Sequence, residues 1–390
     1  MRLLRRHSVS DGTLLNTRET LVGTPMYPYP LDRGDKLRWS ALLGELKAVL
    51  SLEAVFGLIP SRDRRDPALE RGFRSVEIVP ISVREVAGQA ARLWLSGRPP
   101  EFGRLATPAW RKRLLARITG SPVLLLGPSA SVFEVPAGAV LDLTDARSRV
   151  RTIAGDRVRP SVLSTELALA RRFRIVLASE DDKSWLVENG ADAAAISVIS
   201  NGVSGRFLAA RRIGGTSEIV FIGNFAFPPN RDGARWFLAD CWPKIHAQAP
   251  SARLRIVGFR ASGIARSLGP GIEIVSDVPD VVPYLETAII AVAPLQSASG
   301  IQNKVLEAMA AGLPVVATSP VARGLARPHP ALVGDDAGSF VSACLTLLAD
   351  EAARADLGAQ GRAYVLARHS WGAAASALGD LLMSPNARRA

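Results

Sequence analysis

The chain has 390 residues, too many for one ordinary hydrophobic core, so we expect two domains of about 200 residues each. Hydrophobic residues make up 48% and charged residues 22%, which excludes a disordered chain, and no apolar run reaches the roughly 18–20 residues of a membrane-spanning helix. The net charge of +12 favours anionic partners, but the sequence lacks the zinc-finger spacing, aromatic RNP-type strand and dense Lys/Arg block that indicate nucleic-acid binding.

The cysteines and the N-terminal composition bear on compartment and metal content. Cys241 and Cys344 are the only cysteines, and none of the short Cys/His spacings of zinc sites is present. Residues 1–20 contain arginines but no apolar stretch like that of a secretory signal. We therefore expect a cytoplasmic protein without a metal or cofactor, in which residues 1–18 form a disordered tail.

In the first half, short apolar runs alternate with helix-like segments, as in a parallel α/β sheet. Residues 32–50 have leucines at helical spacing. The strand-like runs are residues 19–25, 122–127, 139–145, 174–180 and 196–203. Each ends in polar or small residues, and the carboxyl ends of such strands are where ligands bind in open α/β sheets. The pattern predicts a Rossmann-like domain over residues 19–203.

The same alternation starts afresh near residue 204. Residues 205–217 are rich in Gly, Arg and Ser and are predicted to be a linker. Five further strand-like runs follow at residues 218–224, 254–259, 272–278, 289–295 and 314–318. The pattern predicts a second Rossmann-like domain over residues 204–370 and a final helix over residues 371–383.

The stretch from Gly300 to Thr318, GIQNKVLEAMAAGLPVVAT, places one lysine and one glutamate at the head of an apolar helix. We expect this helix to begin near Gly300, where free N–H groups and the positive end of the dipole bind anions. Lys304 adds a charge for a diphosphate, and Glu307, on the same helical face, can accept both hydroxyls of a ribose. An ordinary surface pair between Lys304 and Glu307 remains an alternative.

This stretch resembles the nucleotide-sugar motif of family 4 glycosyltransferases. The resemblance implies the GT-B fold, in which two Rossmann-like domains face one another across a cleft and a C-terminal helix crosses back to the first domain. Other segments match in the expected order over residues 20–383, among them YPYPLDRGDKLR, VLDLTD, VISNGV and FIGNFAFPPNRDGARWF. The sequence is most similar in character to sugar transferases of bacterial exopolysaccharide and exosortase systems.

The resemblance also implies the roles of individual residues. Glu307 would hold the ribose, and Lys304 with the backbone of Ile301 to Asn303 would hold the diphosphate. The implied donor-binding set is Gly34, Asn224, Val278, Pro279, Gly300, Ile301, Gln302, Asn303, Lys304 and Glu307. The implied catalytic set is Lys304, Glu307 and Asp145.

Three of these residues have other interpretations. Val278 and Pro279 would hold the base, but they could form a plain turn. Gly34 would face the donor phosphate and the acceptor across the cleft. It could equally be a helix entry capped by Asp32, with Asp35 and Lys36 exposed.

The sequence departs from the family pattern at three positions. Ser299 stands where the family often has the first of two glutamates, eight positions before Glu307. The Arg and Lys that commonly follow the first strand of the second domain are also missing, and Asn224 and Asn230 lie there instead. We therefore expect Lys304 to carry the diphosphate charge.

The resemblance implies a retaining, metal-independent hexosyltransferase. It would move sugar from a UDP- or GDP-linked donor to a glycan or a polyprenyl-diphosphate-linked acceptor, in exopolysaccharide biosynthesis. Two alternatives are a GT-B scaffold subunit without catalysis and a nucleotide-sugar epimerase. The histidines His7, His246, His329 and His369 form no catalytic or metal set and are expected to be surface or capping residues.

An anionic membrane surface is a further expected partner, on the inner face of the plasma membrane. Residues 1–200 hold 30 Lys and Arg against 22 Asp and Glu, so they carry most of the net positive charge. The candidate basic clusters are Arg62, Arg64 and Arg65, and Arg111, Lys112 and Arg113. The second cluster adjoins Trp110 and two leucines, which predicts an amphipathic helix lying in the interface.

Overall fold

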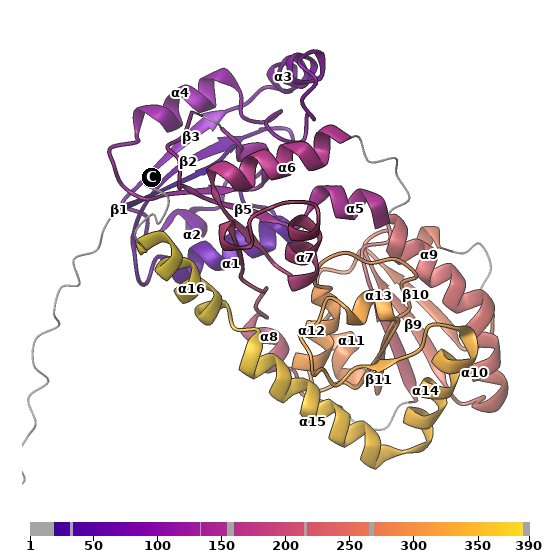
Figure 1. The fold of residues 1–390 in the computed structure, drawn as a ribbon. Coiled ribbons are helices and arrows are strands. Elements are labelled where there is room, and N and C mark those ends of the chain that lie inside the picture. The colour runs from indigo at the N-terminus through magenta and orange to yellow at the C-terminus, as the bar shows by residue number, and fades with distance from the viewer. Residues whose placement is uncertain are drawn as a thin grey trace, which may run out of the picture.

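The computed structural model describes residues 19–31, 34–132, 134–153, 160–213, 217–264 and 269–384. The predicted tail, residues 1–18, and the predicted cap Asp32 lie outside the described residues, as does His7. The described chain forms two α/β bodies that lie side by side, the first in indigo to magenta and the second in orange (Figure 1).

Seven strands within the described residues form the first sheet, all parallel, in the order β3-β2-β1-β4-β5-β6-β7. Their bounds are β1 Glu19–Thr24, β2 Ser51–Leu58, β3 Ser75–Pro80, β4 Val123–Leu126, β5 Val140–Thr144, β6 Arg174–Leu177 and β7 Ile196–Val198. β1 pairs with both β2 and β4, so the order of the strands reverses between β1 and β4. A crevice opens at the carboxyl ends of strands wherever such a reversal occurs.

The second sheet repeats this design with six parallel strands in the described part, in the order β10-β9-β8-β11-β12-β13. Their bounds are β8 Glu218–Ile222, β9 Arg253–Gly258, β10 Ile272–Ser276, β11 Ile290–Ala293, β12 Val315–Ala317 and β13 Leu332–Val333. Its reversal lies between β8 and β11. The ten strands predicted from apolar runs are all present.

Sequence reasoning missed β2, β3 and β13. β2 and β3 do not read as plain apolar runs because they carry Glu53 and Glu77. Arg117 contacts both carboxylates, at 3.5 Å from Glu53 and 3.1 Å from Glu77, so the two charges are paired across the strands. β13 has only two residues and gives no periodicity to read.

Helices cover both faces of each sheet (Figure 1). In the first domain they are α1 Gly34–Leu46, α2 Pro67–Glu70, α3 Val83–Leu95, α4 Pro108–Ala116, η1 Pro128–Ala130, α5 Arg147–Ile153, α6 Pro160–Arg172, α7 Glu180–Glu188 and η2 Ala193–Ala195. In the second they are α8 Gly205–Leu208, α9 Pro228–Trp236, η3 Phe237–Cys241, α10 Trp242–Gln248, η4 Ala261–Gly263, α11 Val282–Thr287, α12 Asn303–Ala310, α13 Ser319–Ala322, α14 Ala337–Ala349 and α15 Glu351–Arg368.

The last helix, α16 (Trp371–Met383), follows α15 and crosses to the first domain, as the fold prediction required. Ser370 caps it by accepting a hydrogen bond from the Ala373 N–H. Trp371, Leu378 and Leu382 join the hydrophobic core that also contains Leu42 and Leu43 of α1. Burial of this apolar face holds α16 on the first domain.

The predicted linker is partly a helix. Residues 205–208 form α8, and Phe207 is buried in the core of the second domain. Arg206 lies over the Phe207 ring, 4.7 Å from its centroid. This part of the linker therefore has a fixed position against the second domain.

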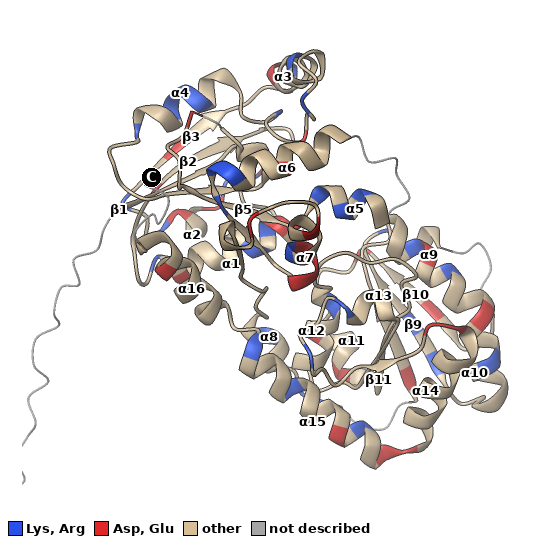
Figure 2. Ribbon diagram, in the orientation of Figure 1, with Lys and Arg blue, Asp and Glu red and all other residues tan. Residues whose placement is uncertain are grey.

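The predicted interfacial helix is wrong in its apolar half. Figure 2 shows basic residues along α4, but Trp110 and Leu114 are fully buried and the Trp110 indole N–H donates to the Val55 carbonyl. Arg111 and Arg113 form ion pairs with Glu134 and Glu77. The apolar face of α4 is thus part of the core. Among the described residues, no helix is both long and apolar enough to cross a membrane.

Candidate functional site

The reversal in the second sheet brings the loop after β8 beside the loop that leads from β11 into α12. α12 begins at Asn303 and not near Gly300, so Gly300, Ile301 and Gln302 form a loop before it. Gln302 donates its side-chain N–H to the Ser299 carbonyl, and no side chain caps this end of the helix. The Val305 N–H donates to the Gln302 carbonyl, and within the described residues the N–H groups of Asn303 and Lys304 before it are available to an anion.

Lys304 points from this first turn toward the loop after β8. Its ammonium donates to the side-chain carbonyl of Asn230 and lies 5.6 Å from the centroid of the Phe221 ring. Burial lowers the pKa of Lys304 from its ordinary value to about 7, and Glu307 offsets part of this shift. The lysine thus contacts Asn230, one of the two asparagines singled out in the sequence.

Glu307 lies one turn further along α12 and lines a groove of about 820 Å³. Burial raises the pKa of Glu307 to about 7, although the charges of Arg206 and Lys304 oppose the shift. Within the described residues the Glu307 carboxylate forms no ion pair and no hydrogen bond, so the alternative of an ordinary surface pair with Lys304 is wrong. A half-buried carboxylate of this kind can accept hydroxyl groups of a ligand.

The groove is built from both domains. Leu37, Ser40 and Ala41 of α1 form one wall, and the N-terminal part of α8 with Pro279 forms another. Its volume falls within the range of about 300–1,000 Å³ that small-molecule sites commonly have. The groove can therefore take a ligand that contacts the two domains together.

Asp145 lies at the carboxyl end of β5 and faces the second domain. A Cβ added to Gly300 would lie 2.5 Å from Asp145 Oδ1 and 3.7 Å from Asp182 Oδ2. Gly300 has φ +59°, so a side chain there is excluded both by the backbone and by the carboxylate. Burial, and then the charge of Asp182, raise the pKa of Asp145 to about 6.

The backbone before Asp145 is strained. Thr144 has φ +67°, which is costly for a β-branched residue. Asp142 stabilises this conformation because its Oδ1 accepts both the Thr144 N–H, at 2.8 Å, and the Thr144 hydroxyl, at 3.2 Å. The strained turn directs Asp145 into the space between the domains.

A buried chain of hydrogen bonds links this turn to α12. Asp142 Oδ2 accepts from Arg38 Nε at 2.9 Å, and Arg38 donates to the Asn201 side-chain oxygen at 2.7 Å. Asn201 donates in turn to the side chain of Asn303 at 2.9 Å. The side chain of Asn303 thus contacts the first domain, which the sequence-based assignment of its backbone to a diphosphate did not anticipate.

The remaining predicted residues are spread around this centre. Asn224 folds its own loop, since its side chain accepts the Ala226 N–H and its carbonyl accepts from Asn230. Pro279 lines the groove, whereas Val278 packs against the core of the second domain. Gly34 is exposed at the start of α1, with open space beside it.

The alternative reading of Gly34 as a helix entry with an exposed Lys36 is wrong for the lysine. Lys36 is fully buried and pairs with Asp63 at 3.0 Å. His369 is also not at the surface: it is buried at the end of α15, with Nδ1 2.9 Å from the Asn201 carbonyl. Its expected capping role agrees with its position as the C-cap of α15.

Sequence reasoning missed the residues that close the groove from outside the motif. Arg206 of α8 faces Glu307 and forms an ion pair with Asp280 at 3.5 Å. Asn201 was noted only as part of VISNGV at the end of the first domain. The position of that segment at the carboxyl end of β7 is the one sequence signal that points to the cleft. No cluster of three or more His, Cys, Asp or Glu placed to hold a metal occurs within the described ranges.

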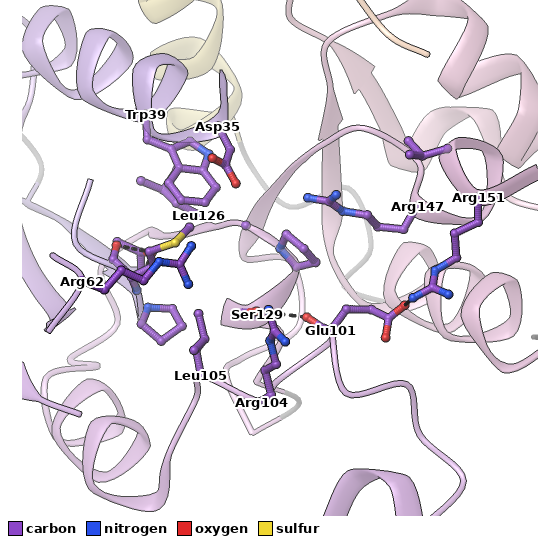
Figure 3. A pocket seen from close by; sticks show the side chains of 16 residues that line it. Asp35, Trp39, Arg62, Glu101, Arg104, Leu105, Leu126, Ser129, Arg147 and Arg151 are labelled. Carbon is purple, nitrogen blue, oxygen red and sulfur yellow. Dashed lines mark hydrogen bonds and ion pairs between the residues drawn. The ribbon is translucent and has the colours of Figure 1, made fainter. Parts of the chain in front are cut away.

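α1 separates this groove from a second hollow at the reversal of the first sheet. Asp35 and Trp39 lie on the opposite side of α1 from the groove and line a pocket of about 190 Å³ (Figure 3). Four arginines from three segments also line it: Arg62, Arg104, and Arg147 and Arg151 of α5. Both reversal points of the molecule therefore carry a candidate ligand site, one on each side of α1.

Comparisons with known proteins agree with this architecture. Residues 216–350 match the family model described as Glycosyl transferases group 1. The chain is similar in fold to HepE from Anabaena in complex with UDP and glucose, at 12% identity and TM-score 0.67, over 94% of this chain and all of HepE. No curated protein sequence matches it.

Two further solved structures share the fold over nearly their whole length. One is sucrose-phosphate synthase from Thermosynechococcus elongatus, at 16% identity and TM-score 0.68, covering 94% of this chain and 98% of that one. The other is WaaG, a glycosyltransferase involved in lipopolysaccharide biosynthesis, at 13% identity and TM-score 0.65, covering 94% and 100%. The protein thus has the GT-B fold that these structures share.

Proposed function

We propose that the protein is a glycosyltransferase that moves a sugar from a UDP- or GDP-linked donor to a glycan or lipid-linked acceptor, with retention at the anomeric carbon and without a metal. The main observation behind this proposal is that Lys304 and Glu307 on α12 are both placed to bind a ligand. Lys304 and Glu307 are half-buried beside an uncapped helix end, and no carboxylate or cation of the described chain forms an ion pair with either. Agreement of the second domain with the glycosyltransferase family model supports the same reading.

In this proposal the nucleotide lies along α12. The ribose hydroxyls donate to Glu307, and the diphosphate meets the N–H groups of the first helical turn and the Lys304 ammonium. Pro279 forms part of the wall for the base. Lys304 compensates for the charges missing at Asn224 and Asn230, because its ammonium already reaches Asn230.

Catalysis would consist mainly of positioning and of stabilising the departing diphosphate. As the bond between sugar and phosphate breaks, negative charge grows on the leaving diphosphate, where Lys304 and the helix N–H groups act. Asp145 lies across the cleft at Gly300 and, with a pKa of about 6, can accept a hydrogen bond from a sugar hydroxyl. The acceptor hydroxyl attacks and its proton leaves with the diphosphate.

Hydrolysis of nucleotide sugars without acceptor tests this function. A transferase releases free sugar and nucleoside diphosphate slowly, a scaffold subunit releases neither, and an epimerase yields a changed sugar still bound to nucleotide. A thermal-shift series with UDP, GDP and ADP identifies the base first. A stabilising shift with one nucleotide, smaller in Glu307→Gln, is expected; no shift with any of them would contradict the donor site.

We further propose that the protein docks on anionic membranes through α3 and not through α4. No residue of α3 is buried, and Val83, Trp94 and Leu95 expose 64%, 58% and 77% of their surface. Arg84 and Arg92 are exposed beside them, and α3 lies at the outer end of the first domain (Figure 1). An exposed apolar stripe flanked by arginines suits the interface of an anionic bilayer.

Co-sedimentation with phosphatidylglycerol vesicles at low and high salt tests this surface. Trp94→Ser should reduce binding strongly, and salt should weaken what remains. Lys112→Ala on the α4 side is the matched control and should bind like the unchanged protein. Equal binding to uncharged phosphatidylcholine vesicles, or none to either, would contradict the proposal without touching the enzymatic function.

A further inference from the structure

The pocket at the reversal of the first sheet has an unusual balance of charge. It lies between the loop after β1 and the loop after β4, at the carboxyl ends of these strands. Arg151 forms an ion pair with Glu101 at 2.8 Å, so that pair is neutral overall. The other charged residues that line the pocket are three arginines and one carboxylate, that of Asp35, so the pocket has an excess of positive charge.

No ion pair joins these three arginines to an acidic side chain in the described part of the chain, although the charge of Arg147 partly offsets the rise that burial causes in the pKa of Asp145 and of Glu166. Arg62 and Arg104 are exposed at the ends of loops, and Arg147 is half-buried at the start of α5. The Arg147 Nε is fully buried, yet it forms no hydrogen bond within the described residues. A buried guanidinium nitrogen without a partner is costly unless a ligand supplies one.

The arginines converge on one space. Figure 3 shows Arg62 and Arg147 extending toward the middle of the pocket from opposite sides, with Arg104 below them near Ser129. Guanidinium groups bind phosphate through paired hydrogen bonds, and several together favour a doubly charged anion over a single carboxylate. Trp39 and Leu105 form an apolar part of the pocket wall.

We propose that this pocket binds a phosphate group carried by the acceptor substrate. The inference rests on the proposed glycosyltransferase function and names the class of its acceptor. The cavity of about 190 Å³ is smaller than the pockets that hold drug-sized ligands, which suits a compact phosphate-bearing end. The phosphate belongs either to a free sugar phosphate or to a polyprenyl phosphate, and both present the same chemistry to the arginines.

The location suits the reaction. Arg147 is close enough to Asp145 for its charge to lower the pKa of that carboxyl, and Asp145 faces Gly300 of the donor side. A phosphate held by Arg147 therefore lies next to the carboxylate at the cleft. The hydroxyl to be glycosylated, on the same acceptor, can then lie near Asp145 and the donor.

The test measures binding by titration calorimetry on protein saturated with the nucleotide that stabilises it, so that the donor site is blocked. Three probes are compared: a hexose 1-phosphate, a short-chain polyprenyl phosphate in detergent, and the unphosphorylated hexose. We expect a phosphorylated probe to bind and the hexose to bind at least tenfold more weakly. Loss of an arginine contact should weaken the phosphorylated probe by ~10–100-fold.

Arg62→Gln is the main variant, because Arg62 is exposed and its replacement should leave the fold intact, as a thermal melt checks. Arg147→Gln is the second variant, and Arg64→Gln, on an exposed neighbour that does not line the pocket, is the matched control. The proposal is supported if the affinity for a phosphorylated probe is lower in Arg62→Gln and unchanged in Arg64→Gln. The phosphorylated probe that binds more tightly identifies whether the phosphate belongs to a sugar phosphate or to a polyprenyl phosphate. Equal binding of all three probes overturns the proposal. An equal loss of binding in Arg62→Gln and in the control Arg64→Gln overturns it as well.

Failure of the two proposals can be told apart. Donor hydrolysis in the unchanged protein tests the glycosyltransferase function alone. If hydrolysis occurs and no phosphorylated probe binds in an Arg62-dependent way, the pocket proposal is overturned and the enzyme remains. If hydrolysis is absent and Arg62-dependent binding persists, the pocket stands as a phosphate site and the glycosyltransferase proposal falls.

Discussion

The two helices that enter the cleft, α1 and α12, both carry cations near their N-termini but treat them in opposite ways. On α1, Lys36 and Arg38 are fully buried and each meets a carboxylate, at 3.0 Å in Asp63 and 2.9 Å in Asp142. On α12, Lys304 meets an amide and an aromatic ring. The first arrangement satisfies its charges within the protein, whereas the second leaves a charge for a ligand to satisfy.

This difference shows that a lysine one turn into a helix does not by itself mark an anion site. Such a lysine is available to an anion only where the fold supplies no opposite charge to pair with it. Buried ion pairs contribute little net stability, but removing one partner is costly because the other charge stays buried and unpaired. The α1 pairs therefore make the wall of the cleft intolerant of change, and the α12 charge should be dispensable for folding.

The largest expected effect is on the α1 side. Arg38→Met leaves Asp142 buried without its partner, and we expect a loss of about 3–5 kcal/mol in the free energy of unfolding. Urea denaturation followed by tryptophan fluorescence measures this loss. A change below about 1 kcal/mol would mean that Asp142 is satisfied in another way and that the two helices do not differ as described.

Lys304→Met tests the opposite side. We expect transfer to fall by about 10²–10³-fold, the scale of losing one preorganised charge at a leaving group, with stability unchanged or slightly raised. Steady-state kinetics and a denaturation curve on the same protein provide the two readings. Lys304→Arg is the matched control and should retain part of the rate. Full activity in Lys304→Met would remove Lys304 from the donor site.

Glu307→Gln should weaken nucleotide binding by about 1–3 kcal/mol, because an amide accepts the ribose hydroxyls less well than a carboxylate does. The corresponding 2′-deoxynucleotide should lose affinity in the unchanged protein and lose little more in the variant. Calorimetric titrations of the four combinations give the coupling between carboxylate and hydroxyl. Additive losses would show that Glu307 does not contact the ribose.

The pH dependence of nucleotide binding sharpens the comparison further. Glu307 has its pKa raised to about 7, so its favourable contribution to folding is full below its ordinary value and is lost as the pH rises through 7. Lys304 has its pKa lowered to about 7, so its contribution is full above its ordinary value and is lost as the pH falls through 7. The two groups together therefore contribute least to the stability of the ligand-free protein near neutral pH, where both can be charged.

A nucleoside diphosphate needs Glu307 ionised and Lys304 protonated, so we expect its affinity to peak near pH 7. Titrations between about pH 5.5 and 9 measure the curve. Glu307→Gln should flatten its acid side and Lys304→Met its alkaline side. Ionisation of the ligand is common to all three proteins and cancels in the comparison. A flat curve in the unchanged protein would contradict the assignment of both groups.

The smallest expected effect is that of a chelator. Since Lys304 and the N–H groups of α12 are proposed to meet the diphosphate charge, transfer should proceed unchanged in excess EDTA. Initial rates with and without chelator are compared, with Lys304→Met assayed in parallel with added Mg²⁺. Loss of turnover in EDTA that Mg²⁺ restores would show that a cation shares the role given to Lys304.

The sequence was sufficient to predict features that depend on local pattern. Continuous apolar runs identified the strands buried on both faces, and the order of motifs led to the GT-B fold. β2 and β3 were not predicted because each carries a glutamate whose charge is neutralised by Arg117, a residue distant in sequence. The local pattern of one sequence does not show which distant residue neutralises a charge within a strand.

The same limit applies to the candidate site. Lys304 and Glu307 could be singled out from their spacing, but the burial of Lys36 could not, because it depends on Asp63 in a different loop. Arg206 was hidden in a stretch that read as a linker, since four residues give no helical period. The arginine pocket gathers its four arginines from three separate segments, so no sequence motif contains them.

The return of α16 to the first domain has a consequence for hybrids made from proteins of this fold. Leu42 and Leu43 of α1 are covered in part by Leu378 and Leu382, so the folded unit around β1 to β7 includes chain from both sides of the second domain. A hybrid that exchanges the first domain must therefore take residues 19–203 and 371–383 from the same parent. A swap with one crossover would pair α1 with a foreign α16 and leave mismatched leucines at the seam.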